Sequence, residues 1–153
     1  MCADTVRPAW RRWDTDYPAT YRWLVVNQTP AAYPHASLTH EIIGGFYDVY
    51  NTLGAGFREA VYERALAIAL ADRRLRVERQ VPVTVRFRGR RAGLFRADLI
   101  VEQTVLLELK ALPALQPAHV AQVLNALRAT GLHLGLLLNF GPEPQVKRLI
   151  LSR

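Results

Sequence analysis

The stretch FRADLIVEQTVLLELKA at residues 95–111 decides the fold that the sequence predicts. Two apolar runs flank the tripeptide at 102–104, and this pattern is typical of two β-strands joined by a short loop. Because side chains alternate between the faces of each strand, a three-residue loop places Asp98 opposite Glu108, with Lys110 on the same face. A loop one residue shorter or longer would separate the two acids. The other face is apolar and consists of Ala97, Leu99, Val101, Val105, Leu107, Leu109 and Ala111.

Two carboxylates that face each other on a sheet repel, so this pair needs an explanation. A divalent cation held between Asp98 and Glu108 by hard carboxylate oxygens would turn the repulsion into a binding site. Lysine usage agrees with a special role for Lys110, because the chain has eighteen arginines and only one other lysine, Lys147. A compact ammonium suits close contact with a water or a phosphoryl oxygen. The alternative is a solvated edge hairpin in which Lys110 and Arg96 neutralise the acids.

Composition narrows the class of protein. The chain has 153 residues, of which 50% are hydrophobic, and this suits one globular domain with a core. The single cysteine, Cys2, excludes a disulfide framework and a cysteine-based zinc site. No apolar run approaches the roughly 20 residues that span a bilayer, and no secretion signal is recognisable. We therefore expect a cytoplasmic protein with no membrane partner.

The formal net charge of +7 favours polyanionic partners. Half of the arginines fall between positions 73 and 96, where Glu78 is the only acid. In the strand predicted at 81–88, valines and Phe87 alternate with polar and basic residues, so one face is apolar and the other basic. Such a face would follow a phosphate backbone, although charge alone is equally consistent with a solvated surface. The candidate nucleic-acid contacts are Arg86, Arg88, Arg90, Arg91 and Arg96.

The remaining pattern predicts an α/β domain. Residues 1–36 contain all three tryptophans and no sustained periodicity, so we expect an irregular or weakly ordered N-terminal extension before a domain at 37–153. A sheet flanked by helices is expected from the order of the elements. The predicted elements are helices at 38–53, 57–74 and 117–131, strands at 81–88, 95–101, 105–111, 134–138 and 146–151, and turns at 89–93 and 139–144.

The ends and faces of the helices follow from particular residues. Ser37 or Thr39 is expected to cap the first helix, and Pro117 and Gly131 are expected to bound the third. The second helix is expected to bury one face. That face consists of Val61, Ala65, Ile68 and Ala69.

Two further polar side chains are placed to face the hairpin. Glu59 shares a helical stripe with Tyr62 and Leu66, which points its carboxylate inward, where it either joins a metal site or pairs with an arginine. Gln122, with His119 one turn before it, is placed to point across the third helix towards the sheet. An isolated glutamine is more often structural than functional.

The segment GFREAVY resembles the signature of the GxxExxY protein family, with Gly56, Glu59 and Tyr62 at the three defining positions. The similarity continues in order through LTHEIIGGFYDVYNTLGAG, RQVPV, FRADLIVE, LLELKAL, HVAQVLNALRATG and GLLLNFG. It therefore covers the chain from the first predicted helix to the C-terminus and excludes the N-terminal extension. One departure is Ala126, where the family often has a tyrosine, and it leaves substrate contacts from the third predicted helix open.

The family in turn resembles the PD-(D/E)XK nuclease-like superfamily, which implies a restriction-endonuclease-like core with a central mixed sheet flanked by helices. By this resemblance Asp98 corresponds to the metal-binding aspartate, and Glu108 and Lys110 correspond to the E-x-K element. Glu59 matches the acidic position of the first core helix. Gln122 matches the glutamine on the helix that follows the three-stranded meander.

The resemblance implies Mg²⁺- or Mn²⁺-dependent hydrolysis of phosphodiester bonds in nucleic acid, with DNA as the favoured substrate. Asp98, Glu108 and the backbone carbonyl of Leu109 would hold the ion, and Glu59 is a further candidate ligand. Lys110 would position the attacking water or stabilise charge on the phosphoryl oxygens. The alternative is a catalytically inactive nuclease-fold module that binds nucleic acid or a protein partner.

Overall fold

The structure is a computed structural model, and it describes residues 35–151. The extension expected at 1–36 therefore lies almost entirely outside the described residues. The elements follow in the order α1 (Ala36–Leu53), α2 (Glu59–Asp72), β1 (Val77–Phe87), β2 (Arg90–Val101), β3 (Val105–Lys110), α3 (Pro117–Thr130), β4 (Leu134–Phe140) and β5 (Pro144–Ile150).

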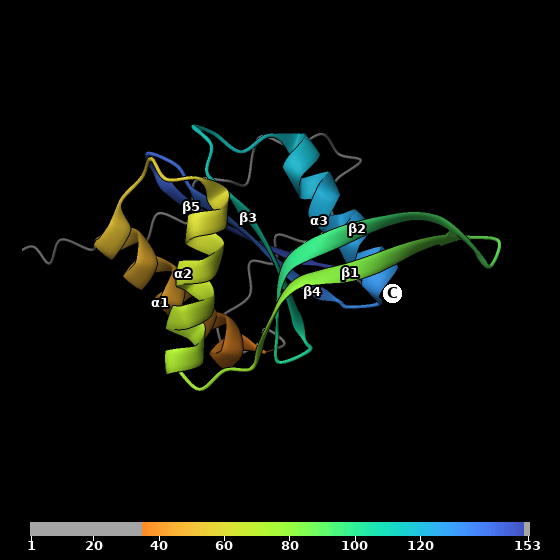
Figure 1. Cartoon of the computed structure of the whole chain (residues 1–153), viewed down its shortest axis with the longest axis horizontal. Helices are drawn as coiled ribbons and strands as arrows, with labels where there is room; N and C mark the ends of the chain where they lie inside the picture. The colour runs from red at the N-terminus through yellow and green to blue at the C-terminus, as the bar shows by residue number, and fades with distance from the viewer. Residues whose placement is uncertain (1–34, 152–153) are drawn as a thin grey trace, which may run out of the picture.

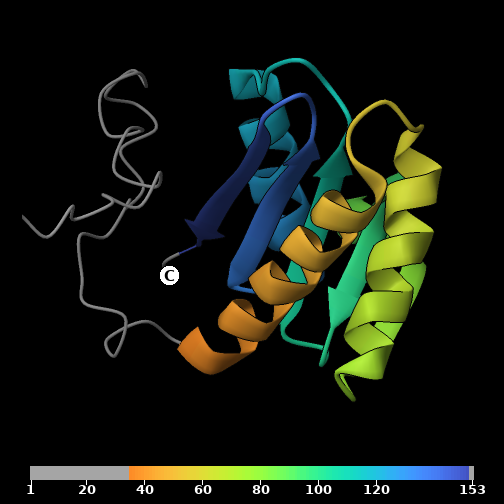
Figure 2. The ribbon, with the colours of Figure 1, turned by 90° about the vertical axis from the view of Figure 1, so that its left-hand side faces the viewer.

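The five strands form one mixed sheet in the order β1-β2-β3-β4-β5. β3 and β4 are parallel, and every other neighbouring pair in this sheet is antiparallel. α3 joins the two parallel strands and covers one face of the sheet, while α1 and α2 cover the other (Figure 1 and Figure 2). The predicted α/β fold, with a central mixed sheet flanked by helices, is confirmed.

Two apolar cores lie on the two faces of the sheet. The larger core joins α1 and α2 to the sheet through side chains such as Phe46, Leu66 and Phe140. The smaller core joins α3 to the opposite face through residues such as Val123 and Leu137. β3 and β4 contribute side chains to both cores, and this explains why their sequences are nearly continuous apolar runs.

The first helix begins earlier than the sequence pattern predicts. Ser37 or Thr39 is the predicted N-cap, but α1 starts at Ala36, directly after His35, and no side chain caps it. Thr39 lies inside the helix, where its Oγ1 donates to the carbonyls of His35 and Ala36 at 3.2 and 3.0 Å. The predicted cap is wrong, because this hydroxyl bonds back to the preceding turn instead of receiving a backbone N–H.

The second helix buries the stripe of Tyr62 and Leu66 that is predicted to point inward with Glu59, and not the face that is predicted as its core. Val61 and Ile68 are predicted core residues, but they are 40% and 64% exposed. The buried stripe contains Tyr62, Leu66 and Leu70, all 0% exposed, while the two alanines of the predicted face are partly buried. α2 is apolar over most of its circumference, so its sequence does not distinguish the two faces. Packing against α1 and the sheet decides between them.

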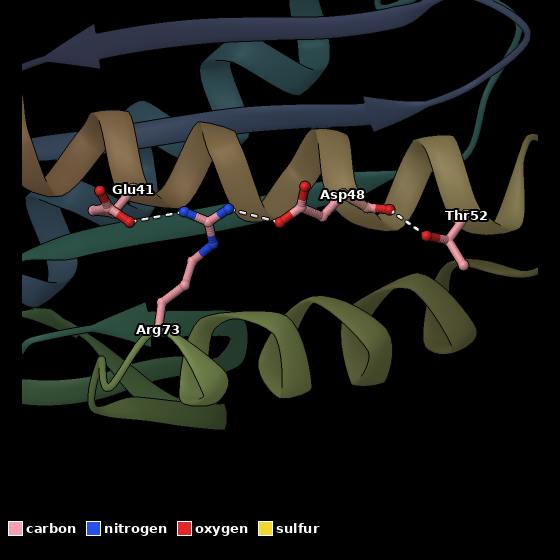
Figure 3. Close-up of polar contacts among 4 residues, drawn as sticks. All are labelled: Glu41, Asp48, Thr52 and Arg73. Atoms are coloured by element: carbon pink, nitrogen blue, oxygen red, sulfur yellow. Dashed lines mark hydrogen bonds and ion pairs between the residues drawn. The ribbon is translucent and has the colours of Figure 1, made fainter.

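α1 and α2 share an exposed group of ion pairs, the Arg73 cluster, which consists of Glu41, Asp48 and Arg73. Arg73 donates to Glu41 at 2.8 Å and to Asp48 at 2.6 Å, and both acids lie on α1 (Figure 3). The backbone carbonyl of Asp48 also accepts the hydroxyl of Thr52 at 2.7 Å. Gly45 allows the two helices to approach, because a Cβ there would lie 2.8 Å from a leucine of α2.

The hairpin of β1 and β2 is longer than predicted and has a tighter turn. The pattern predicts a strand at 81–88 and a turn at 89–93, but the turn consists of Arg88 and Gly89. Both have positive φ, 50° and 74°, as the favoured two-residue hairpin turn requires. The paired strands therefore continue to Phe87 and project beyond α3 (Figure 1).

The third helix and the last two strands lie close to their predicted positions. Pro117 begins α3, and Gly131, in the left-handed conformation, ends it. The turn between β4 and β5 is shorter than predicted, because Asn139 and Phe140 continue β4 and Pro144 already belongs to β5. These elements follow the periodicity and turn signals of the sequence.

Candidate active site

β2 and β3 stop pairing next to Asp98. Their backbone pairing ends at Leu99 and Leu107. One residue further along β2, Asp98 Oδ2 accepts a hydrogen bond from the backbone N–H of Leu109 at 2.8 Å. A carboxylate thus takes the position that a strand carbonyl would otherwise occupy, and it lies against the end of β3.

The apolar face predicted for this hairpin is not continuous. Leu99 packs in the core beneath α1 and α2, whereas Ala97 packs in the core beneath α3. The change of side coincides with Gln80 on β1, whose φ of 51° interrupts the regular strand between Arg79 and Val81. The prediction of one uninterrupted face is wrong at Ala97, because alternation holds only while the strands stay regular.

Glu108 and Lys110 lie on β3 and contact each other. Lys110 Nζ lies 2.9 Å from Glu108 Oε1, and the two side chains are only 13% and 5% exposed. Gln122 on α3 donates its Nε2 to the same carboxylate oxygen. The structure therefore brings three of the predicted site residues into direct contact, and the charge of Asp98 acts on Glu108 as well.

Glu59 is the first residue of α2, and its carboxyl is half-buried. The charges of Lys110, Asp98 and Glu63 all affect its pKa. The predicted inward direction of Glu59 therefore agrees with its place near the other acids. The Glu59 side chain adds a third carboxyl group to this site.

The other two residues of the GxxExxY signature shape the loop before α2. Gly56 has a φ of 111°, a left-handed conformation that glycine adopts without strain. Tyr62 is fully buried, and its hydroxyl donates to the carbonyl of Gly54 at 2.6 Å and accepts the N–H of Phe57 at 3.1 Å. Both residues hold the backbone that leads into Glu59, so their role in the site is indirect.

Burial affects the pKa of each of these groups. It raises the pKa of Glu108 to about 7, and the charge of Asp98 adds to the rise against the effect of Lys110. Burial also raises the pKa of Asp98 and that of Glu59. Burial would lower the pKa of Lys110, but its hydrogen bond to Glu108 and the surrounding acids raise it above its ordinary value. An added cation would favour the ionised form of all three carboxyls.

Sequence reasoning missed two polar residues beside Asp98. Glu63 on α2 is buried, and it accepts hydrogen bonds from Gln80 Nε2 at 2.7 Å and from Arg79 Nε at 3.0 Å. Gln80 also interacts with Asp98, and this interaction acts to lower the pKa of that carboxyl, against the larger effect of burial. The helical spacing of four residues after Glu59 is a signal that could have found Glu63. No sequence pattern indicates Gln80, since its role depends on a backbone conformation.

The left-handed conformation of Gln80 is itself informative. Such a conformation costs a residue other than glycine about 1 kcal/mol or more. Strained residues of this kind gather at functional sites, where the surrounding contacts hold them in place. Here the contacts to Glu63 and Asp98 hold the Gln80 side chain.

α3 contributes differently from what its sequence predicts. Gln122 reaches Glu108 as expected. Burial and the nearby charge of Lys110 lower the pKa of His119. Its Nδ1 accepts the backbone N–H of Gln116 at 2.9 Å, so this histidine caps the helix. Ala126 is buried in the core beneath α3, so it offers no surface to a substrate.

The arginines between positions 73 and 96 differ in their partners. Arg73, Arg76 and Arg79 each form an ion pair with an acid within 3.7 Å. The candidate nucleic-acid contacts are all exposed and form no ion pair among residues 35–151. They are Arg86, Arg88, Arg90, Arg91 and Arg96.

A metal ion at this site would need ligands besides carboxylates. Among the described residues, no three histidine, cysteine, aspartate or glutamate side chains are arranged to hold an ion by themselves, so Glu59, Asp98 and Glu108 do not form such a group. Mg²⁺ commonly binds through one or two carboxylates and keeps several waters. Asp98 and Glu108 fit that donor set, because both hydrogen bonds to Glu108 use Oε1 and leave Oε2 for an ion.

Comparison with known proteins identifies the superfamily of this chain. Residues 36–149 match the PD-(D/E)XK nuclease superfamily. Among solved structures, one titled "Crystal structure of SSO0001" is similar over 76% of this chain, with 18% sequence identity and a TM-score of 0.48, and this chain spans 59% of that one. No curated protein that was compared matches the sequence. Because the family match extends over most of its length, the chain belongs to the PD-(D/E)XK nuclease superfamily.

Proposed function

We propose that this protein is a Mg²⁺- or Mn²⁺-dependent nuclease that hydrolyses phosphodiester bonds of nucleic acid, with DNA as the favoured substrate. The observation that carries the proposal is the buried group formed by Asp98, Glu108 and Lys110 where β2 and β3 stop pairing. Buried acids with raised pKa values are costly to a fold and are concentrated at functional sites. Membership of a nuclease superfamily supports phosphodiester hydrolysis as the reaction of these three residues.

Asp98, Glu108 and the backbone carbonyl of Leu109 are the proposed ligands of the ion. The N–H of Leu109 meets Asp98, and the N–H and C=O of one strand residue point to the same side, so its carbonyl faces the same space. When bound, the ion polarises the scissile phosphate and lowers the pKa of a coordinated water. Glu59 would hold a water of the ion's shell or act as an additional ligand.

Lys110 and Gln122 have distinct proposed roles. Lys110 stays protonated because its pKa lies above its ordinary value, and an ammonium has three donors. It therefore keeps its contact with Glu108 while a second N–H orients the attacking water or stabilises a phosphoryl oxygen. Gln122 fixes the rotamer of Glu108 through its own hydrogen bond and would orient that ligand.

The exposed arginines of the β1–β2 hairpin are the proposed contacts to the phosphate backbone. Their lack of an acidic partner in the described part of the chain leaves their charge available to a polyanion. Contacts of this kind position a nucleic acid without reading its sequence. The residues concerned are Arg86, Arg88, Arg90, Arg91 and Arg96.

The group within the superfamily, the bounds of the domain and the location in the cell are further parts of this proposal. We assign it to the GxxExxY group within the superfamily, because Gly56, Glu59 and Tyr62 each have a structural reason to occupy that motif. The nuclease domain is proposed to occupy 37–153. No helix within residues 35–151 has the length and apolar character needed to cross a bilayer. The cytoplasm is the location that we propose from the sequence.

A cleavage assay tests the proposal. Plasmid, linear duplex and single-stranded DNA are incubated with the protein and Mg²⁺, Mn²⁺ or a chelator. We expect metal-dependent cleavage that falls by about 100-fold or more in Asp98→Asn and in Lys110→Met. The first variant removes a charged ligand of the ion, and the second removes the cation that would stabilise a phosphoryl oxygen. Glu41→Gln is the matched control, since Glu41 is an acid in an exposed ion pair outside the site.

Two outcomes would overturn the assignment. Equal cleavage by the wild type, Asp98→Asn and Lys110→Met would place the chemistry elsewhere or in a contaminant. Absence of cleavage together with tight, salt-sensitive binding would favour the inactive nucleic-acid-binding module. Thermal unfolding of each variant establishes that it is folded before activities are compared.

A further inference from the structure

The free end of the β1–β2 hairpin, residues 84–94, forms an arm outside the body of the domain (Figure 1). Val83 and Phe95 are the last residues of these strands that pack in the core beneath α3. Beyond them three large apolar side chains are exposed. They are Val85 at 40%, Phe87 at 65% and Leu94 at 50%.

The arm combines basic and apolar side chains. Arg86 pairs directly with Arg91 across the strands, and like charges in that position destabilise a sheet. The arm contains four arginines and no acid, so no carboxylate within it offsets this repulsion, and Arg86 donates to the carbonyl of Gly89 at 3.2 Å. Val85 lies opposite Gly93, which has no side chain to cover it, and Phe87 lies opposite Arg90. The arm therefore presents exposed apolar side chains and arginines next to one another.

Phe87 is the most exposed large apolar side chain of the described residues. The turn residues Arg88 and Gly89 have positive φ and place Phe87 at the very end of β1. The guanidinium of Arg88 lies 5.1 Å from the ring centroid of Phe87. An open hollow of about 470 Å³ adjoins the ring, lined by Phe87, Arg88, Arg90, Arg91 and Ala92.

We propose that this arm binds unpaired bases of single-stranded or frayed nucleic acid, with Phe87 stacked on one base and the arginines on the flanking phosphates. Base–aromatic stacking flanked by basic side chains is the general means by which proteins hold single strands. Arginines alone would serve a duplex equally well, but an exposed ring gains most where a base face is open. This inference rests on the proposed function only in taking nucleic acid as the partner.

Binding measured in a chelator tests the inference without any cleavage. Fluorescent oligonucleotides are titrated as a single strand, as its blunt duplex, and as the duplex with a single-stranded overhang. We expect Phe87→Ala to weaken binding of the single strand and the overhang by about 5- to 100-fold. Binding of the blunt duplex should change by less than about twofold, and Phe87→Trp should restore the preference.

A second variant separates stacking from charge. Arg86→Gln combined with Arg91→Gln should weaken all three substrates and reduce the dependence of binding on salt. If Phe87→Ala weakens binding of all three oligonucleotides equally, or of none, the proposed stacking on Phe87 is overturned. If the wild type binds no oligonucleotide, the arm faces another class of partner and the inference also fails. The chelator keeps the result independent of the metal site, and Glu41→Gln, a change of an acid outside that site, should bind like the wild type.

Discussion

Two groups of charged residues in this molecule each combine acids with one basic residue, and they differ in burial. In the Arg73 cluster one arginine lies between two acids, and all three side chains are at least 30% exposed. In the acidic site, which consists of Glu59, Asp98, Glu108 and Lys110, three acids surround one lysine, and the central pair is nearly buried. Exposed pairs contribute little and need no function to explain them. A buried excess of negative charge is costly, so it points to a ligand that is absent from the fold itself.

The largest expected difference between the two groups is their response to a divalent cation. Mn²⁺ at about one hundred times its dissociation constant should raise the free energy of unfolding by about 2.7 kcal/mol, because it binds the folded state alone. Asp98→Asn should abolish this gain, whereas Glu41→Gln should keep it. Thermal unfolding with Mn²⁺ and with a chelator measures both. Equal stabilisation of the two variants would show that the ion does not bind at the acidic site.

The next effect is a dependence of stability on pH. The pKa of Glu108 is about 7 in the folded protein, above its ordinary value of 4.5, so the folded state binds more protons than the unfolded state between these pH values. Stability without metal should therefore fall by about 2 kcal/mol as pH rises from 4.5 to 7. Urea unfolding at both pH values, in a chelator, measures the fall. Glu108→Gln should reduce the fall and leave the part that comes from Asp98 and Glu59, whose pKa values burial also raises. An unchanged slope in that variant would assign the effect to other groups.

A smaller effect is expected from the residue that holds Asp98. Gln80→Gly removes the side chain that contacts Asp98 and Glu63, and it also relieves the left-handed backbone at Gln80. Metal affinity should fall by about tenfold, as for other residues that orient a ligand, with little loss of stability. Mn²⁺ titration by calorimetry measures the affinity.

A matched control exists for the Gln80 experiment. Gln103 has nearly the same φ, 52°, but lies in the exposed loop between β2 and β3. Gln103→Gly relieves the same backbone conformation without touching the acidic site. It should leave metal affinity unchanged. A tenfold loss of affinity in both variants would show that backbone flexibility, and not the Gln80 side chain, is responsible.

The smallest effect is expected at the exposed group. Arg73→Gln removes both ion pairs between α1 and α2. We expect a slight fall in the midpoint of thermal unfolding at low salt that disappears at about 1 M salt, because such pairs are screened. Metal affinity and cleavage should not change. A loss of cleavage in Arg73→Gln would contradict the division of the charged residues into a structural and a functional group.

The sequence predicted the acidic site better than it predicted the surroundings of that site. Asp98, Glu108 and Lys110 follow from strand alternation and the length of one loop, and both are local properties. Gln122 follows from helical periodicity on α3. Glu63 and Gln80 do not follow from any local pattern, since their contacts join α2, β1 and β2 across the fold.

The sequence by itself determined the order of the elements, the pairing of β2 with β3 and the common face of Glu108 and Lys110, because periodicity and turn chemistry act over a few neighbouring residues. Only the tertiary structure decided which face of α2 is buried, where the β2–β3 pairing ends, and which arginines are paired with acids. Those outcomes depend on contacts between residues far apart in the chain. Burial, which raises the pKa of Glu108, arises only when these distant segments pack together.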